Sequence, residues 1–354
     1  MRNLVLTGGG TAGHCTPCLS LLPLLEKRFD NVYYIGSENG IEREMVKNAG
    51  VEYFSVPAIK LKRSLSLSNL TIPFILTSGI SAAKKLLKKL NASVVFSKGG
   101  YVALPVAIAA GKLGVPLVLH ESDLTLGLAN KISARYACEV LTSFRETAEN
   151  LKNGLFTGAP VNPALLSAPR AEGRRRYGIT GLKPVLLVFG GSSGSVAINR
   201  VLRGVLPALT EKFNVLHLTG KNGYDENAKD VKGYFQIPFE PEMKYAYAAA
   251  DVAVSRAGSN SLFELAALKI PALLIPLPKG ASRGDQIDNA RYFASRGAFR
   301  ILLQEDITGE KFTEEIIKTY ESRLNLTLSQ QKFQKNANET IAERIVRASL
   351  KTSR

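Results

Sequence analysis

Short apolar runs alternate with helical patterns along the whole chain, and they fall into two series that each begin with a glycine-rich turn. The first series opens with LVLTGGGTAGH at Leu4, and the second with VLLVFGGSSGS around residue 186. Continuous apolar strands between amphipathic helices indicate parallel sheets covered on both faces. Because crossover connections are right-handed, two doubly wound, Rossmann-like α/β domains facing a cleft are predicted.

The strands expected in the two series are short and bounded by turn residues. The first series comprises Leu4–Thr7, Val32–Ile35, Tyr53–Val56, Ser93–Ser97, Pro116–His120, Glu139–Thr142 and Leu155–Thr157. The second comprises Pro184–Phe189, Asn214–Leu218, Tyr234–Ile237, Asp251–Ser255, Pro271–Ile275 and Ala298–Leu302.

The length of 354 residues also favours two domains, because a single core rarely grows beyond about 250–300 residues. A turn at Gly158–Pro163 ends the first series, and a polar connector at Ala168–Arg176 follows it. The predicted domains are 1–163 and 164–340, with a helical tail at 341–354. From Leu326 onward the chain is expected to be helical and to pack back across the junction.

Composition excludes several classes of protein. With 45% hydrophobic and 21% charged residues, the chain can bury two cores and is not disordered. Three cysteines cannot form a disulfide framework, and the first strand runs straight into a glycine loop without a signal-peptide pattern. A cytosolic location is therefore expected.

The formal charge of +16 is concentrated in one acid-free stretch. The 68 residues between Glu52 and Glu121 contain nine Lys or Arg, seven of them in two clusters, Lys60–Arg63 and Lys84–Lys89. The apolar run Leu70–Leu76 lies between the clusters, and Gly79 is expected to end it. This pattern suits an anionic membrane surface, and equally a solvated helix face over a buried stripe. A spanning helix is not expected because the stretch is too polar, and no nucleic-acid motif is present.

The first glycine turn matches the dinucleotide-binding pattern G-x-G-x-x-G through Gly8, Gly10 and Gly13, with Glu38 farther along. In that pattern the glycines let the backbone approach a pyrophosphate at a helix N-terminus. A tight strand-to-helix turn is the plainer interpretation. His14 ends the turn, and a histidine there is suited to proton transfer at neutral pH.

Cys15 and Cys18 form a C-x-x-C at the start of the same helix, where a thioredoxin-like motif would lie. A zinc site would need four ligands, and the chain has only Cys138 and two distant histidines left to supply them. Small residues in a packed turn are the favoured interpretation.

Further polar blocks follow other predicted strands, where open α/β sheets bind ligands. They are the glycine turns Lys98–Tyr101 and Gly190–Ser195, the block SRAGSNSLFEL from Ser255, and SRGDQIDN from Ser282. Ser259 and Ser261 are expected to cap a helix, and Glu264 could accept hydrogen bonds from both hydroxyls of a ribose, or simply favour the helix dipole. No D-x-D occurs, so no metal site is expected at a diphosphate.

GGGTAGH, SKGGYVALP, HESD, GGSSGS, SRAGSNSLFE and DQIDNA occur in this order. With them the chain resembles the bacterial GlcNAc transferases of peptidoglycan synthesis, from residue 3 to about residue 305. The resemblance implies a GT-B fold, UDP-GlcNAc as donor, and inversion at the anomeric carbon without a metal or other cofactor. It implies an undecaprenyl-linked muramoyl-pentapeptide as acceptor, through its C4 hydroxyl, at the cytoplasmic face of the plasma membrane. Peptidoglycan synthesis also connects such an enzyme with cell shape and division.

The resemblance also implies roles for individual residues. Domain 1–163 would hold the acceptor and face the membrane, and domain 164–340 would hold the donor. Base candidates are His14 and Glu121. Residues implied to contact substrates are Thr11, Ala12, Gly13, Ser192, Ser259, Asn260, Ser261, Glu264, Asp285 and Gln286. The chain departs from the common pattern at Ala12, Asp123 and Asn162, where many members have Gly, Asn and Arg.

Two other functions stay open from the residues themselves. One is a nicotinamide-dependent oxidoreductase built on Gly8, Gly10, Gly13 and Glu38. The other is a non-catalytic module that binds a membrane surface. The first predicts an effect of NADH on stability, and the second predicts lipid binding without any nucleotide effect.

Overall fold

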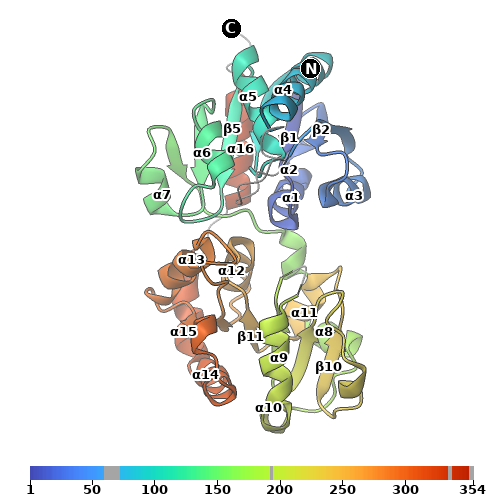
Figure 1. The fold of residues 1–354 in the computed structure, drawn as a ribbon, viewed down its shortest axis with the longest axis vertical. Helices are drawn as coiled ribbons and strands as arrows, with labels where there is room; N and C mark the ends of the chain where they lie inside the picture. The colour runs from blue at the N-terminus through green and yellow to red at the C-terminus, as the bar shows by residue number, and fades with distance from the viewer. Residues whose placement is uncertain (60–71, 192–193, 334–336, 351–354) are drawn as a thin grey trace. The chain divides into compact units, whose positions relative to one another are not determined.

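The computed structural model describes residues 1–59, 72–191, 194–333 and 337–350. The chain forms two compact units, one of residues 1–162 with 335–354 and the other of residues 163–334 (Figure 1). Each unit contains one parallel sheet, with seven strands in the first and six in the second. The predicted pair of doubly wound α/β domains is therefore confirmed.

The first unit has the strand order β3-β2-β1-β4-β5-β6-β7. Its strands are β1 Asn3–Thr7, β2 Asn31–Gly36, β3 Glu52–Ser55, β4 Ala92–Ser97, β5 Leu117–Glu121, β6 Glu139–Thr142 and β7 Gly154–Phe156. Its helices are α1 Ala12–Leu19, α2 Leu22–Leu25, α3 Ile41–Asn48, α4 Ile72–Lys89, α5 Ala103–Leu113, α6 Leu128–Ser133, α7 Arg145–Glu149 and α16 Ala337–Ser349.

The side chains of β1 alternate between two cores, one on each face of the sheet. Leu4 and Leu6 point into a core shared with α1, α2, α3 and α16, whereas Val5 points into a second core shared with α4 and α5. All three side chains are fully buried. A strand buried on both faces needs a nearly continuous apolar run, as the sequence pattern indicated for residues 4–6.

The second unit has the strand order β10-β9-β8-β11-β12-β13. Its strands are β8 Val185–Phe189, β9 Asn214–Leu218, β10 Tyr234–Ile237, β11 Val252–Ser255, β12 Ala272–Leu274 and β13 Arg300–Ile301. Its α-helices are α8 Arg170–Arg176, α9 Val196–Gly204, α10 Leu206–Lys212, α11 Met243–Ala249, α12 Ser259–Ala267, α13 Asp285–Ala294, α14 Gly309–Glu321 and α15 Arg323–Gln330. Its 3-10 turns are η2 Pro163–Leu166, η3 Glu226–Ala228, η4 Gln304–Asp306 and η5 Gln331–Phe333.

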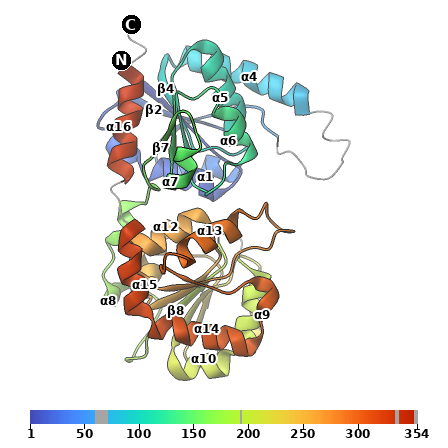
Figure 2. The same ribbon diagram turned by 90° about the vertical axis from the view of Figure 1, so that its left-hand side faces the viewer.

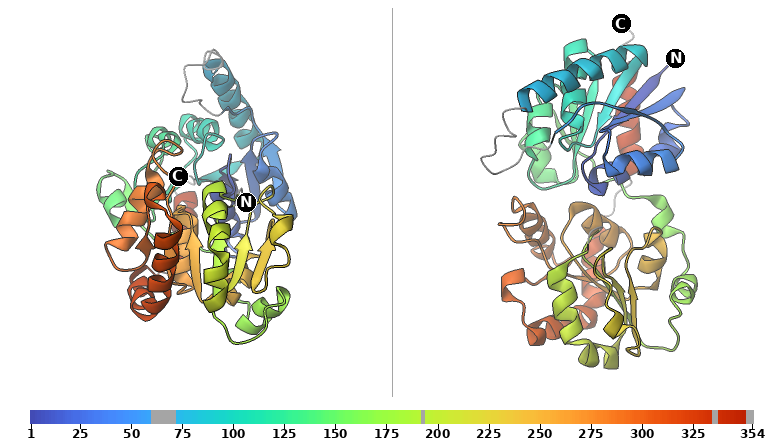
Figure 3. Two further views of the ribbon diagram at one scale, coloured as in Figure 1. Left: turned by 60° about the horizontal axis from the view of Figure 1, so that its bottom comes forward. Right: turned by 45° about the vertical axis from the view of Figure 1, so that its right-hand side comes forward.

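Every strand expected from the sequence is present within a few residues of its expected bounds. On one face of the second sheet, Leu186 and Val188 of β8 pack with α9, α10 and α14. On the other face, Phe189 contacts Tyr247 of α11 edge-to-face. Figure 3 shows α9 running alongside the strands of this sheet.

The C-terminal end differs from the expected division at 340/341. That boundary would cut α16, which is one continuous helix beginning at Ala337. Helix α16 lies against the rest of the first unit (Figure 2), and its Ile341 and Ile345 are fully buried in that unit's core. Arg344 also forms a two-pronged ion pair with Glu139. The last helix therefore completes the first unit, whereas α15 remains in the second.

Helix α4 runs through Gly79, contrary to the expectation that this residue would end the apolar run. Gly79 is buried, and a Cβ there would collide with the carbonyl oxygen of Pro57 and lie 3.2 Å from Pro105 of α5. Glycine is thus required by close packing rather than by chain termination. The helix lies on the outside of the first unit against α5 (Figures 1 and 3). The first basic cluster, residues 60–63, lies outside the described residues.

No helix in the described part of the chain has both the length and the apolarity needed to cross a bilayer.

Each sheet reverses its strand order at one position, between β1 and β4 in the first unit and between β8 and β11 in the second. In open parallel sheets, ligands bind beyond the carboxyl ends of the strands at such reversals. Thr7 pairs with Ser97, and Phe189 pairs with Ser255, so the loops beyond each pair begin at the same level. These four loops are the glycine-rich or serine-rich blocks that the sequence singled out.

Candidate functional site

In the first unit, the loop after β1 and the loop after β4 are packed against each other through glycines. Gly10 has φ +85° and Gly100 has φ +84°, which favour glycine. A Cβ on Gly10 would collide with the ring of Tyr101, and a Cβ on Gly100 with the carbonyl oxygen of Gly9. The glycines therefore allow two backbone loops to meet at the point where the strand order reverses.

A buried carboxylate, Glu42 of α3, holds the first of these loops in place. Its Oε2 accepts the N–H of Gly10 at 3.2 Å, and its Oε1 accepts the N–H and hydroxyl of Ser37 at 3.1 and 2.5 Å. The Tyr34 hydroxyl donates to the carbonyl of Gly8 at 2.7 Å. Glu38, which the dinucleotide pattern singles out, is exposed. The acidic residue that contacts the glycine loop is thus Glu42, and its role is to shape the loop.

The predicted contacts Thr11, Ala12 and Gly13 form the start of α1, with Thr11 as its N-cap. Thr11 Oγ1 does not cap the helix but lies 2.8 Å from Nδ1 of His14. His14 is part-exposed in the first turn of α1. When Nδ1–H donates to Thr11, the imidazole lone pair lies on Nε2, the arrangement that a general base requires.

Lys98 directly follows β4, and only 2% of its surface is exposed. Its ammonium donates to Nδ1 of His120 at 2.8 Å and also contacts the hydroxyl of Ser122. Nε2 of His120 donates to the carbonyl of Gly158 at 3.0 Å, which leaves Nδ1 as the acceptor. Burial lowers the pKa of Lys98 to about 8, and burial beside Lys98 lowers the pKa of His120 well below its usual value. A buried cation and a neutral imidazole thus lie beneath this loop.

Glu121, the other base candidate, ends β5 with both carboxylate oxygens engaged. Oε1 accepts the N–H of Asp123 at 3.0 Å, and Oε2 accepts the N–H of Gly127 and the side-chain amide of Asn130 at 3.0 and 2.9 Å. Its pKa is raised, chiefly because the side chain is buried. Through these contacts Glu121 holds the loop between β5 and α6 in place.

The C-x-x-C motif is not accessible to a redox partner. Cys15 and Cys18 are fully buried free thiols in the core of the first unit. Burial raises the pKa of the Cys15 thiol to about 11 and raises that of Cys18 further. Because the thiolate is the reactive species, these cysteines act as small apolar residues, as the sequence favoured.

In the second unit, the Arg256 guanidinium lies between the loop after β8 and the loop after β12. It donates to Ser195 Oγ and Gln304 Oε1, both at 2.7 Å, and to the carbonyls of Ile275 and Pro276 at 3.0 and 3.3 Å. Arg256 is 8% exposed, and none of these four acceptors carries a charge. A buried positive charge therefore lies directly beside the glycine loop that precedes α9.

The block after β11 forms the start of α12, as predicted, but its N-cap is Gly258 rather than a serine. Ser259, Asn260 and Ser261 are the first three helical residues, and the glycine at the N-cap makes no side-chain cap hydrogen bond. Glu264 lies one turn farther along, where Oε2 accepts the hydroxyl of Tyr247 at 2.8 Å. Burial raises the pKa of Glu264 to about 7, against the effect of that hydrogen bond.

Asp285 and Gln286 begin α13, which follows β12. Gln286 Oε1 accepts the N–H of Leu277 at 3.1 Å, so its amide group is fixed against the loop that leaves β12. Asp285 forms an ion pair with Arg283 at 3.5 Å. Ser192, the remaining predicted contact, lies outside the described residues.

Within the described ranges, no group of three or more His, Cys, Asp and Glu side chains is arranged to hold a metal ion.

Three buried charged side chains of these loops have no role predicted from the sequence: Glu42 on α3, Lys98 after β4 and Arg256 after β11. Lys98 and Arg256 are the first residues after β4 and β11, so the rule that ligands bind at the carboxyl ends of strands could have identified them. Glu42 is one of several acidic residues in a first helical turn, and nothing in the sequence distinguishes it. Its role depends on burial, which only the fold reveals.

The chain matches family models along most of its length. The models for the N-terminal and C-terminal domains of glycosyltransferase family 28 match residues 4–142 and 185–345. Among curated relatives, a protein from Lachnospira eligens is 42% identical over 335 residues, which make up 94% of this chain and 95% of that protein. A protein from Clostridium botulinum strain Alaska E43 is 42% identical over 349 residues, 98% of each chain. Both are named UDP-N-acetylglucosamine–N-acetylmuramyl-(pentapeptide) pyrophosphoryl-undecaprenol N-acetylglucosamine transferase.

Solved structures agree with these matches. The crystal structure of Acinetobacter baumannii MurG superposes with a TM-score of 0.75 at 26% identity and covers 98% of this chain and 100% of that one. The calicheamicin glycosyltransferase CalG4 gives a TM-score of 0.72 at 14% identity, over 100% of this chain and 99% of that one, which supports the fold alone. The two parallel-sheet units thus have the GT-B fold, as expected, and the chain belongs to glycosyltransferase family 28.

Proposed function

We propose that this glycosyltransferase transfers GlcNAc from UDP-GlcNAc to the C4 hydroxyl of undecaprenyl-diphospho-muramoylpentapeptide, with inversion and without a metal. The names of the curated relatives supply the donor and the acceptor. The observation that supports a nucleotide-sugar site in this chain is the buried Arg256 guanidinium. It lies beside a glycine loop at the strand-order reversal of the second unit and is hydrogen-bonded only to uncharged acceptors among the contacts described above.

The second unit supplies the proposed donor site. The N-terminus of α12, from Ser259 to Ser261, presents backbone N–H groups and the positive end of the helix dipole to the diphosphate. Arg256 adds a full positive charge, and Ser192 of the glycine loop adds a hydroxyl. Glu264 accepts hydrogen bonds from the ribose. Developing charge on the UDP leaving group is therefore stabilised by the helix start and the guanidinium.

The α13 start supplies the proposed sugar contacts. Gln286 uses its Oε1 to hold the N–H of Leu277, which leaves its amide N–H groups directed to GlcNAc hydroxyls. Asp285, beside it, accepts hydrogen bonds from another hydroxyl of the sugar. Both side chains follow β12, the neighbour of β11 in the sheet.

The first unit supplies the proposed acceptor site. Thr11, Ala12 and Gly13 start α1 and bind the acceptor diphosphate through backbone N–H groups. Nε2 of His14 takes the proton from the C4 hydroxyl as its oxygen bonds to the anomeric carbon, while the bond from that carbon to the UDP oxygen breaks. The three loop contacts of Glu121 support His14 as the base and a loop-positioning role for Glu121.

The acceptor carries an undecaprenyl chain, so the proposal includes peripheral binding to the anionic cytoplasmic face of the plasma membrane. Helix α4 supports this part. Phe74 at its start is 77% exposed, and Lys85, Lys88 and Lys89 near its end are exposed to solvent. Apolar and basic side chains on one outer helix match the chemistry of a lipid surface.

Ligand protection distinguishes this proposal from its two rivals. We expect UDP and UDP-GlcNAc to raise the melting temperature in proportion to the logarithm of their concentration, and NADH to leave it unchanged. If NADH raises the melting temperature and UDP does not, the chain is a nicotinamide-dependent oxidoreductase built on Gly8, Gly10 and Gly13. Vesicle binding without any nucleotide effect would establish the non-catalytic membrane module.

A further inference from the structure

Tyr247 is a buried tyrosine that joins three parts of the second unit. It lies on α11, is 3% exposed, and donates its hydroxyl to Glu264 Oε2 at 2.8 Å. Its ring meets Phe189, the last residue of β8, edge-to-face with 5.9 Å between ring centroids. The same side chain therefore contacts the strand that leads into the glycine loop and the carboxylate proposed to bind ribose.

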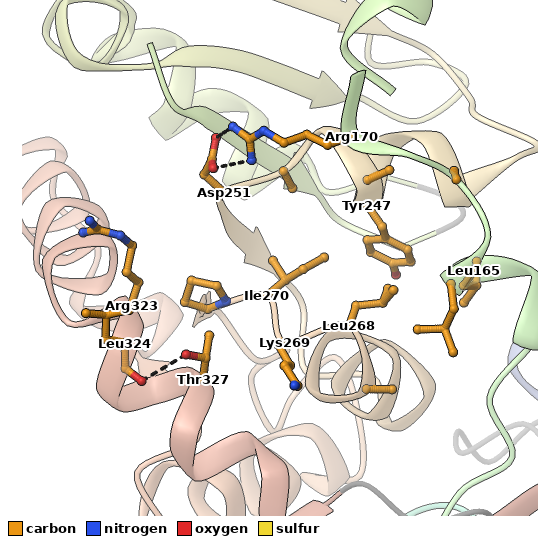
Figure 4. Close-up of a pocket in the computed structure, with 16 residues that line it drawn as sticks. Leu165, Arg170, Tyr247, Asp251, Leu268, Lys269, Ile270, Arg323, Leu324 and Thr327 are labelled. Carbon is orange, nitrogen blue, oxygen red and sulfur yellow. Dashed lines mark hydrogen bonds and ion pairs between the residues drawn. The ribbon is translucent and has the colours of Figure 1, made fainter. Parts of the chain in front are cut away.

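Helix α11 packs closely against α8. Gly173 of α8 allows the two helix backbones to touch, because a Cβ there would lie 2.5 Å from the carbonyl oxygen of Tyr245. Behind the ring is a cavity of about 470 Å³, lined by side chains that include Leu165, Leu268 and Ile270 (Figure 4). A tyrosine kept only to fill space would not need a hydroxyl directed at a carboxylate.

The Tyr247 hydrogen bond leaves part of the Glu264 carboxylate available to a ligand. An ionised carboxylate has about four acceptor positions. Tyr247 occupies one of them, through its hydroxyl on Oε2 of the Glu264 carboxylate. The remaining positions are enough for two vicinal hydroxyls, provided that the carboxylate keeps one orientation and its charge.

We propose that Tyr247 is a positioning residue of the donor site, which orients the Glu264 carboxylate for the two hydroxyls of a ribose. This inference rests on the proposed function of Glu264. Tyr247 touches no substrate itself. Without its hydroxyl the carboxylate would keep its burial but lose the donor that fixes its orientation and stabilises its charged form.

The pKa of Glu264 distinguishes the two possible roles of Tyr247. Losing a hydroxyl that positions the carboxylate raises this pKa, whereas losing mere packing of the ring would not. Burial raises the Glu264 pKa to about 7, and the Tyr247 hydroxyl opposes that rise. The pKa of Tyr247 itself is raised well above its usual value, so it remains a neutral donor. Arg323 of α15 and Lys332 of η5, two other elements packed on α12, are both exposed to solvent. Helix α13, whose Phe293 packs on Phe263 of α12, carries Asp285, Asp288 and Arg291. Loss of the hydroxyl therefore raises the pKa of Glu264 further.

The test is Tyr247→Phe in the full chain, with UDP titrated calorimetrically at pH 6.5, 7.5 and 9. The ring and the cavity wall are kept. Because loss of the hydroxyl raises the carboxyl pKa, we expect UDP binding to weaken several-fold at pH 6.5 and less at pH 7.5, and most of the deficit to close at pH 9, where the carboxylate is ionised in both proteins. Tyr245→Phe is the matched control, because Tyr245 is on the same helix and stacks on Arg176 instead, at 4.6 Å.

Glu264→Gln separates failure of this inference from failure of the function on which it rests. If UDP affinity is unchanged in Glu264→Gln, the ribose assignment is wrong and the positioning role falls with it. If Glu264→Gln weakens binding but Tyr247→Phe matches the parent protein at every pH, the positioning inference alone is overturned. An equal loss at all three pH values with a lowered melting temperature would mean that Tyr247 only packs. We expect Tyr247→Phe to add no further loss in the Glu264→Gln background.

Discussion

At the scale of single residues, the surroundings of the three histidines separate one from the others. His120 and His217 are fully buried, and burial lowers both pKa values, that of His217 to about 3. Each is hydrogen-bonded through both ring nitrogens within the fold. His14 is part-exposed at a helix start where the strand order reverses. It is therefore the histidine placed to exchange a proton with a substrate.

Replacing His14 tests this placement. We expect His14→Ala to lower the transfer rate about 10²- to 10⁴-fold, because a positioned general base contributes an effect of that size. UDP affinity should stay within about twofold, since none of the proposed UDP contacts belongs to the first unit. Steady-state rates and UDP titration on the same preparation check both parts. If the transfer rate of His14→Ala is close to that of the parent protein, another residue is the base.

Glu264 links the donor site to stability. Its folded pKa is about 7, above the usual value near 4.3, so the folded state binds more protons between these values and stability falls as pH rises through that range. Above pH 7, the buried ionised carboxylate lowers the free energy of unfolding by on the order of 3 kcal/mol. Glu264→Gln should therefore raise the melting temperature at pH 8 and not at pH 4.5. Thermal melts at both pH values check this, and a variant less stable at both would contradict it.

In the proposed donor site the ionised carboxylate accepts hydrogen bonds from UDP, so UDP binding should have the opposite pH dependence. The affinity of the parent protein for UDP should rise from pH 6 to pH 8. Glu264→Ala should weaken UDP binding by about 1.5–3 kcal/mol at pH 8, the worth of a charge-assisted hydrogen bond. An unchanged UDP affinity in the folded variant would remove Glu264 from the donor site.

At the scale of elements, the sequence predicts the strands, but it does not predict which residues of several helices contact the loops. A strand buried on both faces has to be continuously apolar, so each run such as Leu4–Thr7 predicts its strand from local sequence alone. The role of Gly79 was not predictable, because the oxygen that excludes a side chain belongs to Pro57. For the same reason the loop contacts of Glu42 and Glu121 could not be foreseen. They depend on which backbone N–H groups the fold brings to each carboxylate.

Helix α4 carries the prediction about the membrane. We expect reversal of Lys84, Lys85, Lys88 and Lys89 to Glu to release the protein from anionic vesicles, since each surface Lys is worth about 1 kcal/mol there. Binding by the parent protein should also weaken as salt rises. UDP affinity should be unchanged. Co-sedimentation with vesicles and UDP titration on the same variant provide the measurement.

A second charge-reversed protein controls for net charge. Lys27, Lys47, Lys131 and Lys152 are exposed lysines on other parts of the first unit, and their reversal changes the formal charge by the same amount. This control should keep most of its vesicle binding. If both variants sediment equally with anionic vesicles, the docking surface does not include the end of α4.

At the scale of the whole molecule, the chain makes two sheets with the same organisation. In each, the strand order reverses beside the first strand of the series, and the conspicuous polar motifs follow the strands at that point. This correspondence is why the sequence could locate the candidate site. The assignment of α16 could not be made in this way. An amphipathic pattern shows that a helix buries one face, but it does not show which core receives Ile341 and Ile345.

The proposed stabilisation of the leaving group by helix N-termini and Arg256, without a metal, has a direct consequence for the reaction. We expect the initial rate of transfer to survive exhaustive chelation largely intact, because the proposed diphosphate contacts are all protein groups. Rates with and without a chelator, followed by addition of Mg²⁺ or Mn²⁺, provide the check. Loss on chelation with recovery on adding either ion would overturn the account of the leaving group.

The most direct measurement is a transfer assay with purified full-length protein, UDP-GlcNAc and the undecaprenyl-linked muramoyl-pentapeptide. We expect UDP release that depends on the acceptor, with one lipid-linked GlcNAc-muramoyl product formed for each UDP released. Both should fall together in His14→Ala. UDP-GlcNAc consumption without any lipid-linked product, or no reaction by a protein that binds UDP and anionic vesicles normally, would contradict the proposed function.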